Sequence, residues 1–180
     1  NVELPVQVTI ASGFPKGDKL EFITQKVTEL GASQIWAFPA DWSVAKWDGK
    51  KLGKKVEKLE KIALGAAEQS KRNLVPSITL FEKKSDFLAQ FDQFDRIVVA
   101  YEESAKEGEV AALLQSLTGL EAESKLLFIF GPEGGLSPAE IESFTAKGAV
   151  LAGLGPRILR AETAPLYALS AVSVFTELMN

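Results

Sequence analysis

The chain has 180 residues and contains neither cysteine nor histidine. Without cysteine it has no disulfide, no thiolate nucleophile and no metal site built on thiolates. Without histidine it has no Ser-His-Asp triad, no histidine metal ligand and no imidazole to move protons near neutral pH. We therefore expect no metal site, and a general base must be a carboxylate, a lysine, a tyrosine or the substrate itself.

Long apolar runs are also missing. No run approaches the ~20 residues of a membrane helix, and no charged and then apolar leader opens the chain, so we expect a cytoplasmic protein with no membrane partner. The 20 basic and 24 acidic side chains give a formal net charge of −4, which does not indicate nucleic acid unless a basic patch is local. With 46% hydrophobic residues, we expect one globular domain over residues 1–180.

Apolar runs alternate with amphipathic segments in the rhythm of a β–α fold. Several of the runs are continuously apolar, which is typical of strands that are buried on both faces. The expected strands are Val6–Ala11, Gln34–Pro39, Ser77–Phe81, Arg96–Tyr101, Lys125–Phe130 and Val150–Leu154. We therefore predict an α/β fold with a mostly parallel sheet and helices on both faces.

Four segments carry apolar residues at helical spacing, and shorter helices separate the remaining strands. The expected helices are Asp18–Leu30 with Asp18 as N-cap, about Lys50–Ser70, a helix that begins at Ser137, and Glu162–Met179. The start at Ser137 is well defined, because Ser137 and Glu140 form a capping box and Pro138 takes the first helical position.

The loop Gly131–Gly135 follows an expected buried strand and opens a helix, so its glycines allow a ligand to approach the backbone. It lacks the Lys-Ser/Thr of a P-loop and the G-x-G-x-x-G spacing of a dinucleotide site. Glu133 would repel a pyrophosphate and suits a cationic or hydroxyl-bearing ligand better. A tight strand-to-helix turn without a ligand is the alternative.

The segment from Leu154 to Ala164 places two arginines and Glu162 around the apolar pair Ile158 and Leu159. Exposed apolar residues in a connector need something to cover them. A solvated connector in which Glu162 and Thr163 merely begin a helix is the alternative. Ligands of parallel sheets bind beyond the carboxyl ends of the strands, so the loops after Phe130 and Leu154 are the expected site.

Three further features allow both a structural and a functional interpretation. The basic residues in Glu68–Asn73 complement a helix dipole or contact an anionic substrate. The lysines between Lys46 and Lys61 form a solvated helix face or contact phosphates. Trp42 and Trp47 fall in an expected loop, where they either pack or stack on a nucleobase.

Four segments in this order resemble one family: Glu29-Leu30-Gly31, Glu68–Asn73 with Pro76, Gly131–Ser137 and Leu154–Ala164. The resemblance is to the bacterial 16S ribosomal RNA uridine N3-methyltransferases of RsmE type, in the SPOUT superfamily. It implies a carboxyl-terminal trefoil knot, a homodimer, small-subunit ribosomal RNA as substrate and S-adenosyl-L-methionine as cofactor. It also implies an amino-terminal RNA-binding barrel of PUA type, which we expect to be absent from this chain, since the sequence begins without an initiator methionine.

The resemblance implies that the two loops hold the cofactor. The residues carried over are Phe130, Gly131, Glu133, Gly134, Gly135, Leu154, Gly155, Ile158, Leu159, Thr163 and Ala164.

Methylation at uracil N3 removes an imide proton, and in a chain without histidine a carboxylate is the natural acceptor. Glu162 is the first candidate, and Glu133 stays open. Arg160 or Arg72 would stabilise the charge that spreads onto the uracil carbonyls, and Asn73 would orient the base.

Three other functions stay open at this point. The first is a SPOUT methyltransferase that acts on a ribose hydroxyl or on another base. The second is a non-catalytic RNA-binding remnant, although the glycines in both loops speak against a lost cofactor site. The third is a nucleotide-binding α/β enzyme that uses the Gly131 loop for phosphate, which Glu133 and the missing lysine oppose.

Overall fold

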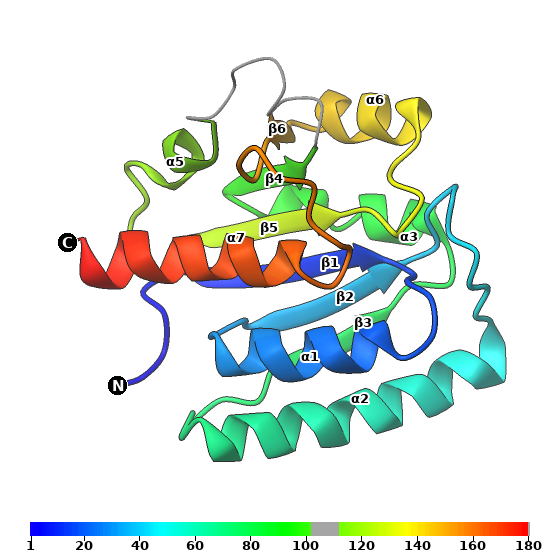
Figure 1. The fold of residues 1–180 in the computed structure, drawn as a ribbon, viewed down its shortest axis with the longest axis horizontal. Helices are drawn as coiled ribbons and strands as arrows, with labels where there is room; N and C mark the ends of the chain where they lie inside the picture. The colour runs from blue at the N-terminus through cyan, green and yellow to red at the C-terminus, as the bar shows by residue number, and fades with distance from the viewer. Residues whose placement is uncertain (102–111, 180) are drawn as a thin grey trace.

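The computed structural model describes residues 1–101 and 112–179. In these ranges six parallel strands form one sheet in the order β3-β2-β1-β5-β4-β6 (Figure 1). The strands are β1 (Gln7–Gly13), β2 (Gln34–Phe38), β3 (Ser77–Leu80), β4 (Arg96–Ala100), β5 (Lys125–Phe130) and β6 (Val150–Ala152). All six predicted strands are confirmed, and no end differs from the prediction by more than two residues.

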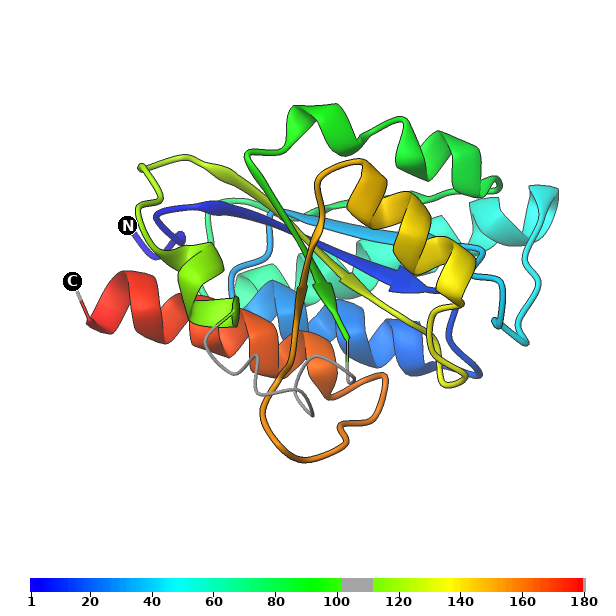
Figure 2. The same ribbon diagram turned by 90° about the horizontal axis from the view of Figure 1, so that it is seen from above.

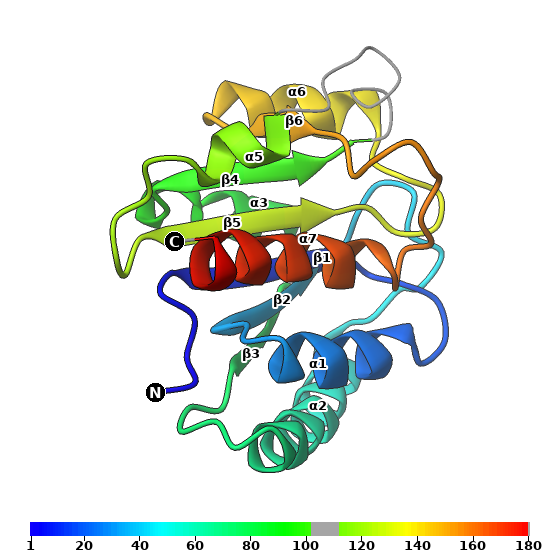
Figure 3. The same ribbon diagram turned by 60° about the vertical axis from the view of Figure 1, so that its left-hand side comes forward.

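Helices cover both faces of the sheet, as the sequence pattern predicts (Figures 2 and 3). Helices α1, α2, α5 and α7 pack on one face, and α3, α6 and the short 3₁₀ helix η1 pack on the other. Their bounds are α1 (Lys19–Glu29), α2 (Gly49–Gln69), α3 (Lys84–Leu88), η1 (Phe91–Gln93), α5 (Ala112–Leu117), α6 (Pro138–Ala146) and α7 (Ala164–Ser173). None of the helices in the described ranges is both long and apolar enough to cross a bilayer.

The central strands have apolar side chains on both faces, and this separates the core into two halves. In β5 every residue after Lys125 is buried, and Phe128 lies in register with Ile10 of β1. On the α3 and α6 side, aromatic rings fill the core. Phe38 stacks on Phe87 with centroids 4.3 Å apart, and Phe144 meets Phe87 edge-on at 5.9 Å. Such pairs add to area burial because the ring quadrupoles are complementary.

Two predicted helix ends are wrong. Asp18 precedes α1, but its ψ of 19° is not the extended conformation of a capping residue, and its side chain makes no capping hydrogen bond. The last helix begins at Ala164 rather than Glu162, because the amides of Thr163 and Ala164 first turn back to the carbonyl of Arg160. It then changes at Val174 into a π-helical turn, η2 (Val174–Leu178).

The predicted capping box at Ser137 is confirmed and forms part of a larger polar network. The Ser137 hydroxyl accepts the Glu140 amide, and Glu140 Oε1 accepts the Ser137 amide at 2.9 Å. Glu140 Oε2 accepts the amide of Asp41 at 2.9 Å and pairs with Lys84 Nζ at 2.8 Å. Asp41 in turn accepts hydrogen bonds from Ser137 and Lys84. The network joins the start of α6, the loop after β2 and the start of α3.

Charge pairing governs the ionisation of this network. Burial disfavours the charged form of Lys84, but hydrogen bonds to Asp41 and Glu140 outweigh it and raise the pKa of Lys84. Hydrogen bonds from Lys84 and Ser137 lower the pKa of Asp41. A raised lysine pKa stabilises the fold until the pH rises through it, and a lowered carboxyl pKa stabilises the fold until the pH falls through it. The network is therefore intact at neutral pH.

Replacing Lys84 with methionine tests the network. The Glu140 side chain is 1% exposed, so the variant leaves a buried carboxylate without its cation. We expect the free energy of unfolding, measured by urea denaturation at pH 7, to fall by about 3 kcal/mol. The neighbouring Lys83 is exposed, and Lys83→Met should change stability by less than about 0.5 kcal/mol. Equal losses in the two variants would show that the pairing contributes nothing.

Candidate active site

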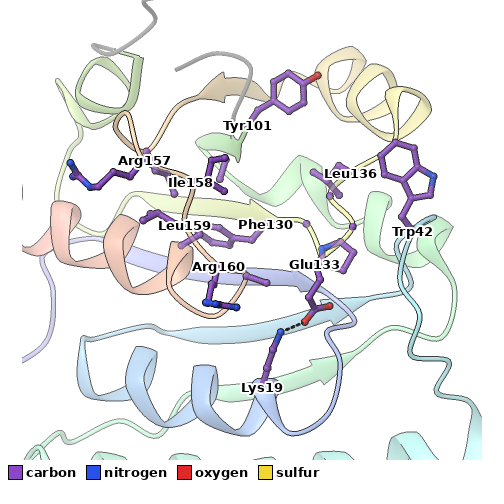
Figure 4. A pocket seen from close by; sticks show the side chains of 18 of the residues that line it. Lys19, Trp42, Tyr101, Phe130, Glu133, Leu136, Arg157, Ile158, Leu159 and Arg160 are labelled. Atoms are coloured by element: carbon purple, nitrogen blue, oxygen red, sulfur yellow. Dashed lines mark hydrogen bonds and ion pairs between the residues drawn. The ribbon is translucent and has the colours of Figure 1, made fainter. Parts of the chain in front are cut away.

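A cavity of about 1070 Å³ opens at the edge of the sheet where the strands end (Figure 4). Its walls come from the loops that follow β4, β5 and β6, from the first turn of α1 and from the loop after β2. Parallel strands bring these loops together because all of their carboxyl ends lie on one edge. The cavity is therefore where the topology of the fold leads us to expect a ligand.

Most of the residues expected to hold a cofactor surround this cavity. Thr163 is the exception: it is exposed and precedes α7 without lining the cavity. The expected residues that line it are Phe130, Gly131, Glu133, Gly134, Gly135, Leu154, Gly155, Ile158, Leu159 and Ala164.

The turn after β5 requires glycine for its own geometry. Gly135 has a φ of +83°, and its amide donates to the carbonyl of Pro132 at 2.8 Å. A Cβ on Gly131 would lie 3.0 Å from the backbone of Gly135 and Leu136. The loop is therefore a tight strand-to-helix turn and, at the same time, a wall of the cavity that a ligand could approach.

The loop after β6 presents apolar and cationic side chains. Ile158 is 77% exposed, and it lines the cavity with Leu159 and Phe130. Arg157 and Arg160 line it as well, and neither arginine forms an ion pair with a described residue. This wall offers an apolar surface for a flat ring and free positive charge for an anion.

Two acidic side chains approach one lysine beside the cavity. Lys19 Nζ lies 2.8 Å from Glu133 Oε2 and 4.0 Å from Glu162 Oε1. Glu133 also accepts the backbone amide of Lys16, so it fixes the start of α1 against the turn after β5. Oε1 of Glu162 is buried and has no hydrogen-bond partner among the described residues.

The contacts of Glu133 determine its protonation. Burial opposes its ionisation, but hydrogen bonds from Lys19 and from backbone amides outweigh burial and lower its pKa. The hydrogen bond to Glu133 raises the pKa of Lys19. Glu133 therefore stays ionised and paired at neutral pH. Glu162 does not line the cavity itself, but it reaches Lys19, which does.

The structure does not bring Arg72 and Asn73 to this cavity. The Arg72 side chain is 2% exposed, and its guanidinium donates to Glu3 and to the carbonyls of Thr28 and Ala32. These partners precede β1 and β2, so they lie at the amino edge of the sheet, whereas the cavity lies at the carboxyl edge. The expected roles of Arg72 and Asn73 in the cavity of their own chain are corrected accordingly.

Sequence reasoning missed several residues that line the cavity. Ala100 ends β4 and Tyr101 follows it, and the rule that placed the other two loops would also have found them. Lys19 gave no signal, because its partner Glu133 is 114 residues away. Trp42, which the sequence left open between packing and stacking, also lines the cavity. The lining residues Pro132, Pro156, Arg157 and Ala161 belong to the two expected loops but had no individual role, and Leu136 and Pro138 follow the first of these loops.

The two tryptophans of the loop after β2 differ. Trp47 packs on Phe14 with ring centroids 4.6 Å apart, and Lys55 Nζ lies 4.1 Å above the Trp47 ring. Trp47 is therefore occupied by packing and by a cation–π contact. Trp42 lines the cavity instead and is 50% exposed.

Comparison with known families gives the class of protein. The family described as "RNA methyltransferase domain" matches residues 2–173, which is nearly the whole chain. The parallel α/β fold and the cavity at its carboxyl edge thus belong to an RNA methyltransferase domain.

Individual relatives define the family more narrowly. The chain is 55% identical over all of its 180 residues to ribosomal RNA small subunit methyltransferase E of Bacillus subtilis, and covers 70% of that protein. The Mycobacterium tuberculosis protein of the same name is 31% identical, with 94% of the chain and 63% of the relative covered. A Neisseria gonorrhoeae ribosomal RNA small subunit methyltransferase E solved with S-adenosyl methionine aligns at a TM-score of 0.79 and 26% identity, over 96% of this chain and 68% of that one. The chain belongs to the ribosomal RNA small subunit methyltransferase E family, and it spans between about 63% and 70% of the length of these relatives.

Proposed function

We propose that the chain methylates N3 of a uridine in 16S ribosomal RNA of the small ribosomal subunit, with S-adenosyl-L-methionine as methyl donor. The observation that carries the proposal is the cavity between the loops after β5 and β6, in a chain 55% identical to a ribosomal RNA small subunit methyltransferase. An RNA substrate of this kind would place the reaction in the cytoplasm.

The residues around the cavity fit S-adenosyl-L-methionine. Phe130, Ile158 and Leu159 provide an apolar wall for the adenine ring, and Glu133 is an ionised carboxylate for a hydroxyl or a cationic group. At Gly155, with a φ of +85°, a Cβ would lie 3.3 Å from Tyr167 Oη, so the backbone here is open only to glycine. The bound cofactor supplies a methyl group activated by a sulfonium.

The side chains of this chain then provide the proton chemistry. Methylation at N3 breaks the N3–H bond, and we assign the proton to Glu162, whose buried Oε1 has no hydrogen-bond partner in the described structure. Glu133 is the weaker candidate because Lys19 and the amide of Lys16 already occupy its oxygens. Arg160 lines the cavity and stabilises negative charge on the uracil carbonyls. In general, alignment of two bound reactants can be worth about 7 kcal/mol or more of the barrier.

We also propose the knotted arrangement of the family. Strand β6 lies at the edge of the sheet beside β4. The helix that follows it, α7, packs instead against the inner strand β5 and against α1 (Figure 3). The chain therefore returns across the sheet between β6 and α7, and this return supports the proposal that the carboxyl-terminal segment is threaded as a trefoil knot. A crystal structure that traces the whole chain tests the threading.

A homodimer is the proposed assembly, and one face of α7 and η2 supports it. Tyr167, Val174 and Leu178 follow at helical spacing and are 38%, 46% and 77% exposed. An apolar stripe of this kind is suited to a self-complementary contact between two copies.

The first experiment tests cofactor and product together. We expect S-adenosylhomocysteine to bind saturably in calorimetry, and we expect mass spectrometry of nucleosides from small-subunit RNA treated with the chain and the methyl donor to show N3-methyluridine. A methylated ribose or another methylated base would identify a different SPOUT methyltransferase. Absence of binding at high micromolar ligand would leave a non-catalytic RNA-binding domain.

Glu162→Gln tests the proton acceptor, and Glu133→Gln is its matched control. We expect Glu162→Gln to lower kcat by about 10²- to 10⁴-fold and to leave the affinity for S-adenosylhomocysteine unchanged. Glu133→Gln should weaken S-adenosylhomocysteine binding, because it loosens the turn after β5, with a smaller loss in kcat. A Glu162→Gln enzyme with full kcat would remove Glu162 from this role.

Val174→Asp tests the assembly. A carboxylate in a buried contact lacks a partner, so we expect the dimer to weaken by about 2 kcal/mol or more and light scattering to show a monomer. Leu64 on α2 is 49% exposed, and Leu64→Asp serves as the control that should keep the dimer mass. A Val174→Asp protein that remains dimeric at micromolar concentration would place the interface elsewhere.

A further inference from the structure

Contacts with other aromatic rings explain the positions of two of the three tryptophans, but they do not explain the position of Trp42. Trp36 is 3% exposed and lies edge-on to Phe81 and Phe94, with ring centroids 5.3 and 5.4 Å away. Trp47 is covered by Phe14 and Lys55. The indole of Trp42 is half exposed, belongs to neither hydrophobic core of the described residues, and lines the cavity.

The backbone of Trp42 is held firmly although its ring is exposed. A Cβ on Gly134 would lie 3.2 Å from the Trp42 carbonyl, so the turn after β5 packs directly on this residue. The preceding residue, Asp41, donates its amide to the buried Glu140 and accepts hydrogen bonds from Ser137 and Lys84. The backbone that carries this large aromatic ring is therefore fixed beside the cavity, which lowers the backbone entropy that is lost when a ligand binds.

The position of Trp42 separates it from the apolar wall assigned to the cofactor. Figure 4 shows Trp42 beside Leu136 at one side of the cavity, and Arg157, Ile158 and Leu159 toward the other. The cavity volume of about 1070 Å³ exceeds the range of about 300–1,000 Å³ that is usual for one small ligand. The space between the two sides is thus large enough for a second flat ring.

We propose that Trp42 stacks on the target nucleobase of the RNA and holds it against the cofactor side of the cavity. The proposal rests on the function proposed above and names the residue that receives the base. An indole offers its face to any nucleobase, and stacking of this kind leaves the base edge free for Glu162 and Arg160. The network of Asp41, Lys84 and Glu140 serves to position the ring.

Replacement of Trp42 with alanine is the central test, with the methylation kinetics of small-subunit RNA as readout. Loss of one base-stacking contact should raise the KM for RNA about 10-fold. We expect kcat at saturating RNA and the affinity for S-adenosylhomocysteine to stay within about twofold of the starting protein, because neither depends on the ring. Trp42→Phe keeps an aromatic face and should recover most of the loss in KM.

Phe22→Ala provides the matched control. Phe22 on α1 is 43% exposed and does not line the cavity, so its loss removes a similar exposed aromatic ring outside the site. We expect unchanged KM, kcat and S-adenosylhomocysteine affinity for this variant.

Fluorescence gives a readout that does not depend on turnover. Stacking on a base quenches indole emission, and Trp42 is the tryptophan that lines the cavity in the described structure. A uridine-rich single-stranded oligonucleotide, added in the presence of S-adenosylhomocysteine, should quench the starting protein and should not quench Trp42→Phe.

The outcomes separate this proposal from the function on which it rests. If the starting protein methylates RNA while Trp42→Ala keeps its KM and the oligonucleotide quenches the starting protein and Trp42→Phe equally, the stacking role is overturned and the methyltransferase function stands. If Trp42→Ala instead loses affinity for S-adenosylhomocysteine at unchanged RNA KM, the ring contacts the cofactor and the proposal is wrong. Absence of any methylation by the starting protein overturns both.

Discussion

The common direction of the strands is the constraint on which the rest of this molecule depends. Because all six strands run the same way, each connecting helix carries the chain back across a face, and the loops that leave the strands emerge at one edge. Segments that are more than 100 residues apart in the chain, such as the first turn of α1 and the turn after β5, meet there and form the cavity. The helices end at the opposite edge of the sheet. There the charged residues pair with one another and hold the fold together, as the ion pair of Arg72 and Glu3 shows.

The carboxylate of Glu140 connects this scaffold to the site. One oxygen closes the capping box of α6, and the other holds the amide of Asp41 and the ammonium of Lys84. A buried carboxylate is costly unless each of its oxygens accepts hydrogen bonds or pairs with a cation. All of these partners must therefore be in place at once for the charge of Glu140 to be tolerated. The same arrangement that begins α6 therefore also fixes the loop after β2 at the cavity.

Local patterns in the sequence predicted most of the fold. The strands were predictable because short, continuous apolar runs are typical of strands buried inside a sheet. The start of α6 was predictable because Ser137 and Glu140 form a complete capping box within four residues. The two loops of the site followed from strand direction alone. Contacts between distant segments were not predictable in the same way. Arg72 resembled a ligand for an anion until Glu3, 69 residues away, and two carbonyls were found to occupy it. Asp18 failed as a side-chain cap because its backbone is not extended, and its carbonyl, not its carboxylate, accepts the amides of Glu21 and Phe22.

The distribution of charge at the cavity reconciles an acidic chain with an RNA substrate. The chain carries a formal net charge of −4, yet the acidic side chains nearest the cavity lie close to a cation: Glu133 is paired with Lys19, and Glu162 lies within 4.0 Å of it. Arg157 and Arg160 line the cavity without an ion pair to any described residue, so the charge left free at its mouth is positive. Attraction to a phosphate acts over about 8–10 Å at physiological ionic strength, so this local charge matters more to an RNA strand than the total does. A nucleotide drawn in by the arginines would meet the cofactor side of the cavity on one side and the indole of Trp42 on the other.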